Sequence, residues 1–154
     1  MHYAVNTHKF AWLIALFLCG HVTVHSQEPD RTKSAVIYVY SYRHVKTLGR
    51  VAPIVYVDGK PLAKLDSTRF FIVRLEPSSH AFHLKDKKRG GIEMDFHAGG
   101  VYYIRMDMRE GSTVGASGLV LMSRENGEFD LRQMKPIDES DIKDRERVTT
   151  SLKN

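Results

Sequence analysis

The side chains best suited to metal or acid–base chemistry are four histidines and two nearby acids: His44, His80, His83, His97, Glu93 and Asp95. His80 and His83 are three residues apart in a segment with strand character, so they face opposite sides of a sheet. A shared metal would need a bulge between them. Glu93 and Asp95 share one face, as in a paired-acid or calcium site, but that face is typical of a strand's solvent-exposed side. Because no acid, base and nucleophile converge, we predict no catalytic residue, no metal site and no cofactor.

Tyrosines form a second group that can act on a ligand. Their rings offer large contact area and a hydroxyl, which suits stacking on sugar rings or binding a peptide. Tyr38, Tyr40 and Tyr103 are the candidates for such a binding surface. We expect most of the tyrosines, however, to lie in the core or in half-buried pairs.

Two short motifs indicate the turns that position these side chains. Asp58-Gly59 lies between β-rich runs, and both residues tolerate the positive φ angles of a type I′ hairpin turn. The Asp58 carboxylate is explained by this turn rather than by a site. Asn126-Gly127 predicts a second hairpin turn, leading into a strand over 129–131.

Short β-rich segments with turns between them cover most of the chain. Alternation of apolar and polar residues is plain from Ile92 to His97 and from Tyr102 to Arg109. The fold class we predict is all-β, an immunoglobulin-like or prealbumin-like antiparallel β-sandwich over residues 34–132, with closure into a barrel as the alternative. Residues 133–154 are polar and predict a short C-terminal helix or a disordered tail.

The first residues are typical of a secretory signal. The uncharged run 10–20 is shorter than the roughly 20 residues of a spanning helix but fits the apolar core of a signal peptide. We expect residues 1–26 to be removed and the protein to be exported, to the periplasm or in association with the cell envelope. A membrane contact is expected only if the signal stays uncleaved or if Cys19 carries a lipid.

The charge pattern narrows the class of partner. The chain has 154 residues and a net charge of +5, with both signs interspersed. The one dense basic run, Lys85–Arg89, is typical of a solvated loop, and a contact with an anionic envelope polymer or lipid headgroup is its alternative. No basic stripe alternates with stacking aromatics, so we expect no nucleic-acid partner.

Several of these segments resemble one family of bacterial envelope proteins. The opening strand ends in Tyr42-Arg43, and Val57-Asp58-Gly59 forms the hairpin. Pro77-Ser78-Ser79-His80 enters a later strand, with Ser78 in place of the family's glycine, and Tyr102-Tyr103 lies in another. This pattern resembles the domain of unknown function 2846 and is similar to PEGA surface-layer modules. The resemblance covers roughly residues 34–132 and implies an exported or lipid-anchored sandwich without an established activity.

These observations predict an exported, non-catalytic β-sandwich module that binds or supports another cell-envelope component, either a protein or a polysaccharide. The alternative is a metal-dependent or acid/base hydrolase acting in the envelope. A third possibility is that an exposed edge strand takes up a partner strand.

Overall fold

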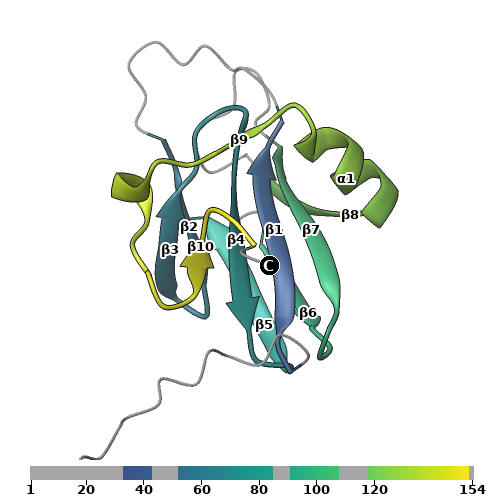
Figure 1. Cartoon of the computed structure of the whole chain (residues 1–154). Coiled ribbons are helices and arrows are strands. Elements are labelled where there is room, and N and C mark those ends of the chain that lie inside the picture. The colour runs from purple at the N-terminus through teal and green to yellow at the C-terminus, as the bar shows by residue number, and fades with distance from the viewer. Residues whose placement is uncertain (1–32, 43–51, 85–90, 108–117, 153–154) are drawn as a thin grey trace, which may run out of the picture.

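A computed structural model describes residues 33–42, 52–84, 91–107 and 118–152 (Figure 1). The predictions for residues 1–26, Cys19, His44 and Lys85–Arg89 concern residues outside these ranges.

One sheet is mixed and has six strands. Its main path runs β10 (Val148–Thr149), β4 (Arg69–Leu75), β1 (Ala35–Ser41), β7 (Val101–Asp107) and β8 (Gly118–Met122). The short strand β9 (Lys135–Pro136) also pairs with β4. β1 is the central strand, with β4 antiparallel on one side and β7 parallel on the other. We call this the mixed sheet.

The second sheet is antiparallel and has four strands in the order β3 (Lys60–Lys64), β2 (Ile54–Val57), β5 (Ser79–Leu84) and β6 (Ile92–Asp95). Asp58 and Gly59 form the two-residue loop between β2 and β3, with φ angles of 50° and 78°. Positive φ at both central positions is what a type I′ turn requires. The predicted turn at Asp58-Gly59 is confirmed.

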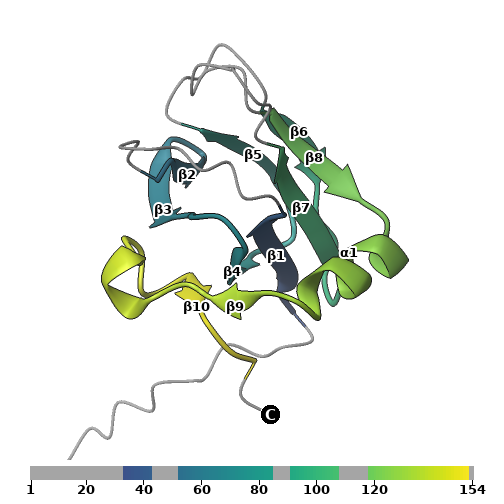
Figure 2. The ribbon, with the colours of Figure 1, turned by 90° about the horizontal axis from the view of Figure 1, so that it is seen from above.

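The core lies between the two sheets because the strands alternate. In β1, Ala35, Ile37 and Val39 are fully buried and belong to one hydrophobic cluster with Phe82 and Leu84 of β5. In Figure 2, β2, β3 and β5 lie on one side of β4 and β1, and helix α1 (Arg124–Leu131) lies on the other. The prediction of a mostly β, sandwich-like fold with two sheets is confirmed. The expected fully antiparallel pairing is wrong, because β1–β7 and β4–β9 are parallel.

Helix α1 corrects the second turn prediction. Asn126 and Gly127 lie inside the helix rather than in a hairpin, and residues 129–131 are helical rather than a strand. Ser123 caps the helix, since its hydroxyl accepts a hydrogen bond from the backbone N–H of Asn126 at 3.3 Å. Gly127 is buried against Tyr103, and a Cβ at this position would lie 2.3 Å from the Tyr103 Cγ. The glycine therefore allows the helix to approach the sheet closely, instead of supplying a turn.

The C-terminal segment joins the two sheets. Strands β9 and β10 pair with the same strand, β4, while the backbone carbonyl of Leu62 in β3 accepts hydrogen bonds from the N–H groups of Lys143 and Asp144, at 2.8 and 3.1 Å. Ile137 and Val148 are buried in the core cluster. Residues 133–152 thus form strands and one 3-10 turn, η2 (Glu139–Asp141), in place of the predicted short helix or disordered tail. We call residues 133–149 the closing segment.

Candidate functional site

At the turn end of the antiparallel sheet, the structure brings the Asp58 carboxylate next to His80, which lies 22 residues later in the sequence. The Nδ1 of His80 lies 2.7 Å from Oδ2 of Asp58, and its Nε2 lies 2.9 Å from both the Ser78 hydroxyl and the Glu76 carbonyl. The Ala81 N–H donates to Oδ1 of Asp58 at 3.0 Å. We call this group the Asp58–His80 clasp, because it ties the β2–β3 turn to the start of β5.

The Asp58 carboxylate is held in its charged form. Partial burial raises the pKa of Asp58, but the hydrogen bonds from Ala81 and His80, with the positive charges of His80 and Arg147, outweigh it and keep that pKa below its ordinary value. The carboxylate therefore has a role beyond the turn geometry that the sequence suggested. No single segment signals this pairing, since 22 residues separate the partners.

The clasp has the connectivity of a Ser–His–Asp triad, but its hydrogen bonds favour another protonation pattern. Asp58 accepts from Nδ1, so activation of Ser78 would require Nε2 to accept the hydroxyl proton. The Glu76 carbonyl can only accept, and its distance of 2.9 Å from Nε2 favours a proton on that nitrogen. An Nε2 that donates to the Glu76 carbonyl cannot at the same time accept the Ser78 proton, so this hydrogen-bond pattern suits a structural clamp better than a general base.

The three predicted binding tyrosines share the outer face of the mixed sheet, under helix α1. Tyr38 and Tyr103 stack with centroids 5.2 Å apart, and the Tyr40 hydroxyl donates to Oδ2 of Asp130 at 2.9 Å. Tyr40 is fully buried and Tyr103 is 4% exposed, so neither ring offers an open stacking surface. Burial and the charge of Glu128 raise the pKa of Tyr103 to about 12. Tyr40 and Tyr103 are thus buried against α1, while Tyr38 is half-buried.

The other candidate ligands do not converge. His83 stacks on Tyr56 with centroids 5.2 Å apart, away from the clasp, while Glu93, Asp95 and His97 are exposed. Within the described ranges, no group of three His, Cys, Asp or Glu side chains is placed to hold a metal ion.

No family model, curated protein or solved structure matches the chain. The resemblance to the envelope family in residues 34–132 therefore stays a prediction. Among the described helices, none has the length and apolar character needed to cross a membrane.

Proposed function

We propose that this protein is a non-catalytic binding module of the cell envelope, which takes up an extended, uncharged segment of a partner protein along the edge of β8. The observation that carries the proposal is the combination of a free edge and exposed apolar side chains in that strand. Among the residues that the structure describes, β8 pairs only with β7.

The side chains of β8 are apolar toward both faces of this edge. Val120 and Leu121 are 39% and 46% exposed, and adjacent residues in a strand point to opposite faces. Natural edge strands are commonly protected by charges or proline, and Gly118–Met122 contains neither. A strand added here would gain backbone hydrogen bonds and apolar contacts on both faces.

The chemistry of β8 favours a polypeptide partner over a polysaccharide. Only a polypeptide supplies alternating N–H and C=O groups in the register of the sheet. The absence of charge within Gly118–Met122 favours an uncharged, β-branched or aliphatic segment. The signal predicted over residues 1–26 supports a location in the envelope.

Hydrogen exchange of the full chain with solubilised envelope extract tests this proposal. We expect slower exchange of β8 amides in the wild type, and loss of that protection in Leu121→Lys, because a lysine there disfavours an added apolar strand. Val101→Lys is the matched control, since Val101 is 40% exposed but lies in β7. Absence of β8 protection in the wild type, or equal protection in Leu121→Lys, would refute the proposal.

A serine hydrolase is the second candidate, favoured only by the distances within the Asp58–His80 clasp. A fluorophosphonate reagent, which labels activated serines, separates the two functions. Our proposal expects no labelling of Ser78. Labelling of Ser78 that is lost in His80→Gln would instead support the hydrolase.

A further inference from the structure

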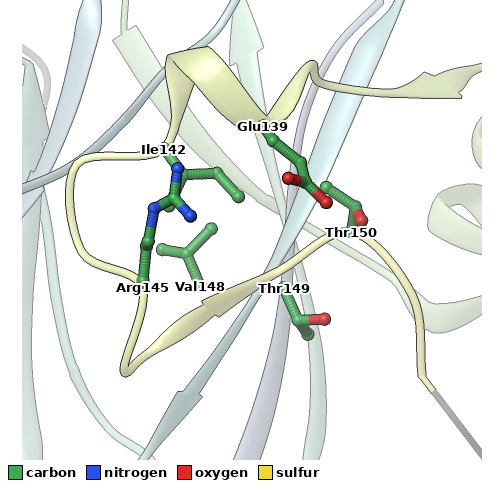
Figure 3. Close-up of a pocket in the computed structure, with 6 residues that line it drawn as sticks. All are labelled: Glu139, Ile142, Arg145, Val148, Thr149 and Thr150. Carbon is green, nitrogen blue, oxygen red and sulfur yellow. The ribbon is translucent and has the colours of Figure 1, made fainter.

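The closing segment and Thr150, which follows it, line a small open pocket whose two charged side chains face it from opposite sides. The pocket has a volume of about 200 Å³ and is lined by Glu139, Ile142, Arg145, Val148, Thr149 and Thr150. Figure 3 shows the Glu139 carboxylate and the Arg145 guanidinium across from one another, with Ile142 and Val148 between them.

The two charges are free to meet a ligand. Among the described residues, neither the Glu139 nor the Arg145 side chain forms an ion pair, whereas the nearby Arg147 is engaged by Asp144 with Nε to Oδ2 at 2.6 Å. Both Glu139 and Arg145 are exposed, so a ligand can reach them from solvent. The floor of the pocket is apolar, because Val148 is buried and Ile142 packs against the core.

We propose that this pocket binds a free α-amino acid with an apolar side chain. The ligand's ammonium group would pair with Glu139, its carboxylate would form charge-assisted hydrogen bonds with Arg145, and its side chain would cover Ile142 and Val148. The volume lies below the range of about 300–1,000 Å³ typical of sites for drug-sized ligands, which limits the occupant to a small molecule. Thr150 also lines the pocket, and its hydroxyl would provide the ligand with a further polar contact.

Opposite charges at two ends of one small pocket select for a zwitterion. A molecule with only one charge would leave either Glu139 or Arg145 unpaired at the pocket wall. The ligand class thus follows from requiring both charges at once. This inference is independent of the proposed role of the β8 edge, which lies in a different part of the molecule.

The test is an NMR titration of the full chain with leucine, N-acetylleucine and leucinamide, following backbone amides of residues 142–150. We expect saturable shifts with leucine, and affinities lower by about two- to fivefold for the two analogues, each of which lacks one charge, because Glu139 and Arg145 are exposed to solvent. Glu139→Gln and Arg145→Gln should each weaken leucine binding by a similar factor.

The controls are Glu146→Gln and Arg132→Gln, which make the same charge changes on exposed side chains outside the pocket lining. Both controls should bind leucine like the wild type. The inference is overturned if leucine gives no saturable shifts in the wild type. It is equally overturned if the analogues bind as well as leucine, or if the control variants lose as much affinity as the pocket variants.

Discussion

At the scale of single residues, Asp58 shows how one side chain can serve two structural purposes. Its backbone occupies the left-handed region that the β2–β3 turn requires, and its carboxylate joins the turn to β5 through His80 and Ala81. The first purpose is readable from the Asp-Gly pair. The second depends on which strands pair, and it is visible only when β2 and β5 lie side by side.

Asp58→Asn separates these purposes, because asparagine also tolerates positive φ but carries no charge. The folded-state pKa of Asp58 lies below its ordinary value, so its charge stabilises the fold above the unfolded pKa of about 3.9 and loses that effect as pH falls through the folded value. We expect the variant to lose about 1 kcal/mol of unfolding free energy near neutral pH, a modest figure because the Asp58 side chain is 42% exposed.

Urea unfolding at several pH values measures this difference, which should shrink toward zero as the solution becomes strongly acidic. Asp95→Asn is the control, since Asp95 is exposed on β6 and belongs to no clasp. If Asp58→Asn lowers the unfolding free energy by the same amount at every pH, the carboxylate charge is not what stabilises the turn.

At the scale of elements, the packing of helix α1 on β7 explains why the Asn126-Gly127 prediction was wrong. The helix has its own local signals, namely the Ser123 cap and an Arg124–Glu128 ion pair at 2.7 Å. The prediction gave more weight to the Asn126-Gly127 pair, because Asn-Gly usually marks a hairpin turn. What fixes Gly127 in place is the Tyr103 ring beneath it, a tertiary contact that no local pattern encodes.

The effect of Gly127→Ala on the unfolding free energy should therefore be opposite in sign to that of the same change in an exposed helix. In an exposed helix interior, replacing glycine by alanine stabilises by about 1 kcal/mol. Here the new Cβ would overlap Tyr103, and we expect a net destabilisation of about 1–3 kcal/mol. Chemical denaturation measures the effect, with Asn126→Ala as the control in the same helix. Stabilisation by Gly127→Ala would contradict the close contact between α1 and β7.

At the scale of the whole molecule, the strands and the sandwich-like arrangement were largely predictable, because period-two patterns identify which face of each strand is buried. The parallel pairing of β1 with β7 was not predictable, since the alternation of apolar and polar residues does not reveal strand direction. The closing segment was also missed: its few apolar residues, among them Ile137 and Val148, do not form a periodic pattern. Each instead fills a gap in a core built by other segments.

Ile137→Ala tests whether the closing segment is part of the fold. Ile137 is 4% exposed and lies in the core cluster, so its truncation should cost about 2–5 kcal/mol of unfolding free energy. Leu152→Ala, at a position that is 37% exposed, should cost much less. Equal and small effects of both substitutions on urea unfolding would mean that the two sheets hold together without this segment.

The position of β1 at the centre of the mixed sheet also bears on the order in which the chain can fold. β1 precedes both of its partners in the chain; it can pair with β4 first, but its other edge stays unpaired until β7 is available, because Val36 lies opposite Val101. Such long-range pairing slows folding and leaves an apolar strand edge open in the meantime. In a refolding chain the interval before β1 and β7 pair is the one most exposed to aggregation, so the yield of refolded protein should fall as its concentration rises.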